Sequence, residues 1–214
     1  MKHCFLLALL IGAVFFVSDA TAGSRVQLEL LGGAVQNAGT PLTLKERGQP
    51  DLEFTASFRS EPFVSPIYYA IRIGLADSPW RLEFNHHKLF LEHPPEPIDF
   101  FSVTHGFNIV TLQYTKQVKM IDLRVGAGPV FGHPESTVRG RSYDQSRGIL
   151  GTGYRVIGPA LLLGAGTDFE LSERFSLVGE GRSTVAPVHV PVNGGSARFT
   201  NVAFHFLFGL GVRF

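Results

Sequence analysis

The chain is nearly free of cysteine, with a single one, Cys4, among its 214 residues. Cys4 falls in an N-terminal segment that we predict to be removed, so the mature protein is expected to contain no thiol. This excludes disulfides, cysteine-liganded metal sites and cysteine nucleophiles. A secreted chain of this size without disulfides must be held together by an extensive core or by a hydrogen-bonded sheet.

An excess of charge of one sign is also lacking. Nineteen lysines and arginines are balanced by 18 aspartates and glutamates, which gives a formal net charge of +1. Nucleic-acid binding usually needs a strongly basic face, so we expect no nucleic-acid partner. Beyond the N-terminal segment there is no apolar run near the roughly 20 residues of a spanning helix. Any membrane crossing must therefore use strands, and in hydrocarbon a closed barrel is the sheet that satisfies every backbone group.

The N-terminus has the regions of a secretory signal peptide. Lys2 precedes an apolar run of 13 residues, 5–17, and the small residues Ala20-Thr21-Ala22 follow it. This run is shorter than a membrane anchor requires, which favours cleavage over anchoring. We predict a Sec-type signal peptide over residues 1–22 and a single domain over residues 23–214.

The last eleven residues, 204–214, alternate with period two. About 9 to 11 residues cross the hydrocarbon in a tilted strand, with one face toward lipid and the other toward the barrel interior. The segment therefore predicts a membrane-spanning β-strand. Its apolar face consists of Phe204, Phe206, Phe208, Leu210, Val212 and Phe214.

Counting back along the chain gives eight such strands, and their connections alternate between short and long, as in outer-membrane barrels. We predict an all-β fold, an eight-stranded antiparallel up-and-down transmembrane β-barrel with both termini on the periplasmic side. Leu52 to Arg59 also alternates, as a strand in its own right or as an extension of the second strand, and the even strand number of bacterial barrels favours the extension. The predicted strands cover about 24–35, 66–76, 80–91, 104–115, 119–131, 156–170, 174–187 and 198–214. The long connections are 36–65, 92–103, 132–155 and 188–197, and the short ones are 76–79, 116–118 and 171–173.

The same alternation assigns acids and bases together to the lumen. An eight-stranded interior is just wide enough to be filled by side chains, so we expect ion pairs and hydrogen bonds to plug it and leave no open pore. The inward positions are Gln27, Glu29, Arg72, Arg81, Glu83, Asn85, Asp122, Arg124, Asp168, Glu180 and Arg182.

The stretch with the most chemistry is His86-His87-Lys88, together with His105 on the next strand. Consecutive strand residues point to opposite faces, so one of His86 and His87 is expected to meet lipid. The apolar stripe changes parity in both strands, which predicts a β-bulge or a local opening. These groups are either solvated near lipid phosphates or form a hydrolytic or transfer site acting on lipid A, with histidine as general base. A zinc site is a third alternative, but the sequence shows no complete ligand set, and we expect no cofactor.

This plan resembles the superfamily of small eight-stranded outer-membrane barrels, which includes outer-membrane protein X, the barrel of outer-membrane protein A, and lipid A deacylase. The resemblance rests on the signal peptide, the strand spacing and the terminal Phe214. It implies a location in the bacterial outer membrane, with outer-membrane lipid and lipopolysaccharide as partners and the barrel-assembly machinery acting during insertion. The deacylases carry a His-x-Ser-Asn run with a serine nucleophile, whereas this chain has His105-Gly106-Phe107-Asn108. Ser102 would face away from His105 unless a bulge intervenes.

We therefore predict a structural or surface-interaction role in the cell envelope. A lipid A-modifying enzyme is the alternative, and a narrow channel is a third. The candidate catalytic residues are His105, His86 and His87, and the candidate ligands for lipopolysaccharide are Lys88, Arg139 and Arg141.

Overall fold

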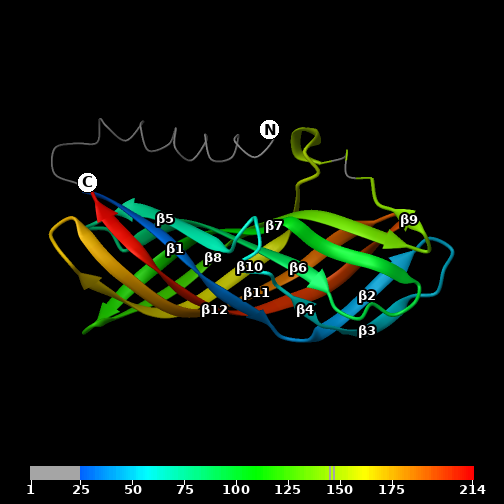
Figure 1. Ribbon diagram of the computed structural model, residues 1–214, viewed down its shortest axis with the longest axis horizontal. Coiled ribbons are helices and arrows are strands. Elements are labelled where there is room, and N and C mark those ends of the chain that lie inside the picture. Colours follow the sequence, from blue (N-terminus) through cyan, green and yellow to red (C-terminus); the bar gives the residue numbers. More distant parts are fainter. Residues whose placement is uncertain (1–24, 145, 147) are drawn as a thin grey trace.

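Eight strands form a closed antiparallel ring in the computed structural model, which describes residues 25–144, 146 and 148–214 (Figure 1). The expected signal peptide, residues 1–22, lies outside these residues. β12 pairs with β1 and closes the ring, which confirms the predicted fold class. The ring strands are β1 (Val26–Asn37), β5 (Tyr69–Leu75), β6 (Trp80–Leu91), β7 (Ile98–Val118), β8 (Ile121–Val138), β10 (Arg155–Glu170), β11 (Phe175–Val192) and β12 (Gly195–Arg213). Within the described ranges, no helix is long and apolar enough to cross a membrane.

Four short strands extend the ring at the end opposite to the C-terminus: β2 (Thr40–Glu46), β3 (Leu52–Ala56), β4 (Phe58–Arg59) and β9 (Arg141–Ser142) (Figure 1). β2 pairs with β12 and with β3, whereas β4 pairs with β6. The segment 52–59 thus runs from β2 across to β6, and residues 60–68 separate it from β5. β3 is a strand in its own right, whereas β4 pairs with the same edge of β6 as β5 and lies beyond it. The expected extension of the second barrel strand is therefore confirmed for residues 58–59 and wrong for residues 52–56, and the even number of ring strands is retained.

The connections at the C-terminal end are short, as predicted, and comprise residues 76–79, 119–120 and 171–174. At the other end, the β6–β7 and β8–β10 connections are shorter than predicted, because β7 begins at Ile98 and β8 continues to Val138. The β1–β5 connection, residues 38–68, is about as long as predicted. The predicted long loop 188–197 was wrong. There β11 and β12 remain paired up to a two-residue turn, Asn193-Gly194, in which Gly194 has a φ of 73°.

The outer wall of the C-terminal end, which we call the membrane half, carries exposed apolar side chains. On β12, Phe204, Phe206, Phe208 and Leu210 are each 50–71% exposed. Large apolar side chains on other strands of the ring, such as Leu30, Leu82 and Leu161, are exposed as well. Trp80 and Phe214 lie near the short-turn end, where an aromatic belt is expected at a membrane surface. This half has the apolar outer band of a membrane-spanning barrel.

The lumen of the membrane half is filled by ion pairs centred on Arg72. Its guanidinium lies 2.6 Å from Glu29 Oε2, 2.8 Å from Glu83 Oε2 and 2.6 Å from Glu180 Oε2. Arg182 adds a contact of 2.7 Å to Glu83. These side chains come from β1, β5, β6 and β11, so the network crosses the lumen, and each of them is at most 5% exposed.

The other end, which we call the outer half, has the reverse polarity. Its interior is apolar and includes Leu42, Phe58, Leu89, Leu91, Phe101, Val103, Val188, Val190, Val192 and Phe199. Its outer wall carries exposed charges such as Lys45, Glu53 and Arg198. The expected polar lumen is therefore restricted to the membrane half. This reversal of polarity also explains the parity change in the sequence. Alternate residues of each strand continue to point inward and outward, but the apolar residues occupy the outward positions in the membrane half and the inward positions in the outer half.

We expect Arg72→Leu to destabilise the barrel by roughly 3–5 kcal/mol, because three buried carboxylates would lose their shared partner. Urea unfolding in lipid vesicles, followed by the fluorescence of Trp80, the single tryptophan, measures this change. Asp51→Asn, which removes the exposed pair with Lys45, is the control and should cost about 0–1 kcal/mol. Equal effects of the two changes would contradict a stabilising role for the network.

Candidate functional site

A β-bulge in β7 marks the boundary between the two halves. Val103 pairs with Pro134 and Phe107 with Gly132, so three residues of β7, Thr104, His105 and Gly106, lie opposite the single residue His133 of β8. Gly106 has a backbone φ of 142°, a conformation that residues other than glycine rarely adopt. The predicted bulge is confirmed, and its effect is to bring His105 to the outer wall, where its side chain is 49% exposed.

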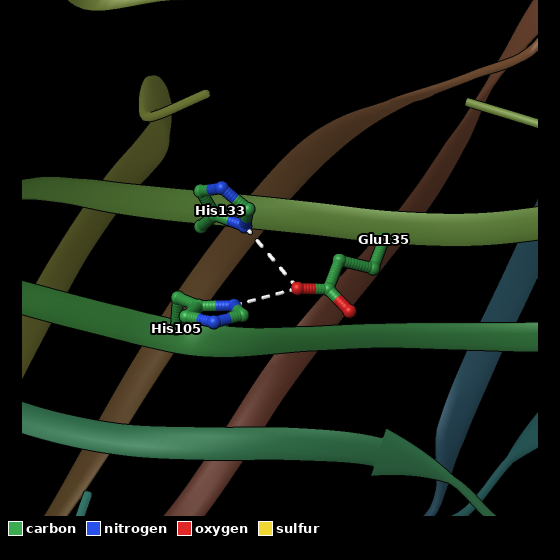
Figure 2. A group of neighbouring side chains, drawn as sticks. All are labelled: His105, His133 and Glu135. Carbon is green, nitrogen blue, oxygen red and sulfur yellow. Dashed lines mark hydrogen bonds and ion pairs between the residues drawn. The ribbon is translucent and has the colours of Figure 1, made fainter. Parts of the chain in front are cut away.

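His105, His133 and Glu135 converge on this wall (Figure 2). His105 Nδ1 lies 2.6 Å from Glu135 Oε1, and His133 Nδ1 lies 3.5 Å from the same oxygen. His133 and Glu135 are two residues apart on β8, so they share a face of the strand. One nitrogen or oxygen atom from each of the three residues lies within 4.8 Å of the other two.

Tyr154 covers the cluster from the segment that leads into β10. Its ring packs at 5.2 Å, edge to face, on the ring of His133, and its hydroxyl donates a hydrogen bond to the carbonyl oxygen of His105. His133 is 8% exposed, and its Nδ1 has no hydrogen-bond partner within the described ranges. Burial, reinforced by the nearby His105, lowers the pKa of His133 and so favours the neutral imidazole. A neutral imidazole nitrogen can accept a proton or bind a metal ion.

The structure places His86 and His87 on opposite faces of β6, as predicted. His86 lies on the outer wall, where Asn108 Oδ1 is 2.7 Å from its Nδ1 and Tyr69 stacks on its ring at 5.2 Å. These two neighbours bury the imidazole and screen it from lipid. His87 points into the lumen, toward His205 and Phe107. The three histidines predicted to converge therefore do not do so, because the barrel wall separates His87 from His86 and His105.

Ser102 is the cross-strand neighbour of Glu135, so it shares the outer wall with the cluster. Because of the bulge, it faces the same side as His105. Its hydroxyl has no hydrogen-bond partner within the part of the chain that the structure describes, and the residue is fully buried. His105 is hydrogen-bonded to Glu135 instead. The site therefore contains an acid and base pair, but not a serine hydrogen-bonded to the base.

The three cations predicted to bind lipopolysaccharide do not form one site. Lys88 is buried, donates a hydrogen bond of 2.9 Å to the carbonyl oxygen of Val64 and lies 4.0 Å from Glu61. Arg139 lies in the β8–β9 turn, 3.2 Å from Glu46, and Arg141 is exposed on β9. The two arginines thus lie at the far tip of the outer half (Figure 1).

Sequence reasoning missed His133 and Glu135, because it ended the fifth strand at residue 131 and assigned 132–155 to a loop. The available signal was the spacing of two residues between a histidine and a carboxylate directly after a clear strand. Such a spacing places both side chains on one face if the strand continues. The register of the bulge, which aligns His105 with them, is not visible in either strand alone.

The ring of eight strands and its apolar outer band define a small β-barrel of the outer-membrane type. No protein-family model matches the sequence, and no curated protein sequence matches it significantly. Among solved structures, the fold is similar to Neisserial surface protein A, with 11% identity, a TM-score of 0.43 and coverage of 90% of this chain and 98% of that one. It is also similar to AlkL, an outer membrane protein, with 13% identity, a TM-score of 0.44 and coverage of 91% and 93%. OprG from Pseudomonas aeruginosa gives 10% identity, a TM-score of 0.41 and coverage of 90% and 96%.

We expect Gly106→Ala to destabilise the protein by about 1–3 kcal/mol, because a side chain at this φ is strained. The added Cβ would also lie 2.4 Å from Nδ2, the side-chain amide nitrogen of Asn108. The free energy of unfolding in vesicles measures the effect. Gly181→Ala, whose Cβ would meet nothing within 4 Å, is the matched control and should be near neutral. If Gly106→Ala proved as harmless as the control, the bulge would not depend on this glycine.

Proposed function

We propose that the protein is a pore-free surface protein of the bacterial outer membrane. Its membrane half is the anchor, and its outer half is a rigid β-structure displayed outside the membrane. The observation that carries this proposal is the reversal of polarity between the two halves. An apolar interior under a charged outer wall is the pattern of a protein in water, whereas the membrane half has the pattern of a protein in lipid.

The lengths of the strands support this division. β7, β8, β11 and β12 contain 18 to 21 residues each, whereas about 9–11 residues suffice to cross the hydrocarbon. Roughly half of each strand is therefore available to extend beyond the membrane. These extensions are continuous with the barrel strands, so the displayed surface is held more rigidly than ordinary loops would hold it.

Aromatic packing supports the rigidity of the outer half. Phe58 on β4 stacks on Phe199 of β12 at 4.8 Å, and Phe101 of β7 packs against both rings. The three rings join strands that are far apart in the sequence. A surface fixed in this way suits recognition of a partner with little loss of conformational entropy on binding.

The ion pairs of the lumen support the absence of a pore. Arg72, Glu83, Glu180 and Arg182 are each almost fully buried, and they bridge strands on different sides of the ring. Moving such a network aside to admit ions would separate buried charges from their partners, which is strongly unfavourable.

Purified protein in planar lipid bilayers should therefore give no stable conductance steps above the level of protein-free bilayers. A porin added to the same bilayers is the positive control. Reproducible unitary currents that scale with the amount of the protein would contradict the proposal and favour the narrow channel.

A lipid A acyl hydrolase is the second candidate, and the His105–Glu135 pair favours it. A carboxylate that orients a histidine supplies two of the three members of a hydrolytic triad, and Ser102 is a hydroxyl on the same wall. This pair lies just beyond the outward residue Phe131, at the edge of the apolar band, where the acyl chains of an outer leaflet would be within reach.

Mass spectra of lipid A separate the two candidates. They would be recorded from cells that express the intact protein, His105→Ala or Ser102→Ala, and from cells that lack the protein. The surface-protein proposal predicts identical spectra in all four strains. Loss of an acyl chain with the intact protein alone would establish the hydrolase.

A further inference from the structure

The cluster of His105, His133 and Glu135 has the composition of a metal site. It offers two imidazole nitrogens and one carboxylate oxygen within 4.8 Å of one another. Zinc binds such atoms at about 2.0–2.2 Å in tetrahedral geometry, which separates the ligand atoms by roughly 3.3–3.6 Å. The 3.5 Å between His133 Nδ1 and Glu135 Oε1 falls in this range. The 2.6 Å between His105 Nδ1 and Glu135 Oε1 is a hydrogen bond, which a metal ion would replace with a small rotation of the carboxylate.

A second observation comes from His133 itself. Its side chain is buried and aimed at Glu135, yet Nδ1 has no hydrogen-bond partner among the residues that the structure describes. A buried polar atom without a partner costs free energy, so a native structure that retains one usually has a reason for it. A metal ion bound between His133, Glu135 and His105 would satisfy this atom.

The local backbone is built to bring these side chains together. Without the bulge, His105 would have the facing of Val103 and Phe107, which point into the apolar interior. The bulge places three residues of β7 opposite His133 and thereby presents His105 on the outer wall. Tyr154 then fixes both histidines, through its ring on one and its hydroxyl on the backbone of the other. Bulges commonly re-aim a side chain next to a functional site.

We propose that His105, His133 and Glu135 bind a divalent transition-metal ion of the zinc class on the outer wall at the bulge. Two nitrogens and one oxygen favour zinc over the hard cations calcium and magnesium, which prefer oxygen ligands alone. Since His105 is half exposed, the fourth coordination position faces outward and takes water. The site is independent of the surface role proposed above, because it uses neither the ion pairs of the lumen nor the far tip of the outer half.

The experiment titrates Zn²⁺ into the purified mature protein in detergent by isothermal calorimetry, and titrates Co²⁺ in parallel to record its absorption spectrum. The proposal predicts one Zn²⁺ per chain and the intense visible bands of tetrahedral Co²⁺. Glu135→Gln keeps the shape of the side chain and His105→Ala alters an exposed position, so both variants should fold. Each variant should weaken Zn²⁺ binding by at least about 100-fold. Loss of a residue that only supports a metal ligand costs up to about 100-fold in affinity, and these variants remove a ligand itself.

His93→Asn is the matched control. His93 is an exposed histidine in the β6–β7 connection with a φ of 47°, a conformation that asparagine tolerates. This variant should bind Zn²⁺ with the affinity of the parent protein. Three results would overturn the proposal: absence of stoichiometric Zn²⁺ binding, undiminished binding by Glu135→Gln and His105→Ala, or tighter binding of Ca²⁺ or Mg²⁺ than of Zn²⁺ at these residues.

Discussion

The structure depends on the closure of one hydrogen-bonded ring whose strands continue beyond its apolar outer band. In hydrocarbon no backbone group can be left without a partner, so β12 must return to β1. In the proposed arrangement the same strands then run beyond the membrane, where β2 and β3 extend the sheet from β12 and β4 pairs with β6. Apart from the bulges, the alternate positions of each strand point inward and outward in the same order along its whole length. The apolar residues must therefore change from outward to inward positions where the strand passes from lipid to water. The charged lumen and the apolar outer interior are two consequences of this single constraint.

The bulge in β7 lies where the two patterns meet. There the interior changes from the polar contacts of His87 and His205 to the apolar contacts of Leu89 and Val103. The outer wall changes at the same level from lipid-facing side chains to a cluster of histidine and glutamate. A boundary of this kind places titratable groups beside lipid without burying them in it, which explains why the chemistry of this barrel gathers at the bulge.

Much of the fold was predictable from the sequence, because each medium imposes a period of two. The alternation of Phe204, Phe206 and Phe208 was sufficient to identify a spanning strand and its facing. The prediction failed at Val188, Val190 and Val192, where the apolar residues lie on the inner face of a strand that was assumed to have ended. The prediction of the candidate site was incomplete for the same reason. His105 was found, whereas His133 and Glu135 were assigned to a loop, and the register that unites the three depends on pairing across two strands.

The reversal of medium along one strand is the central claim, and spin labels on β12 test it directly. Single cysteines at the outward positions Phe208, Phe204, Arg198 and Ser196 would be labelled in the mature protein in lipid vesicles, where no native cysteine is expected. The collision rates of the labels with oxygen and with a water-soluble nickel complex would then be measured. We expect the labels at 208 and 204 to collide more often with oxygen, and those at 198 and 196 to collide more often with the nickel complex. Dominance of oxygen at all four positions would place the outer half in the membrane and contradict the account.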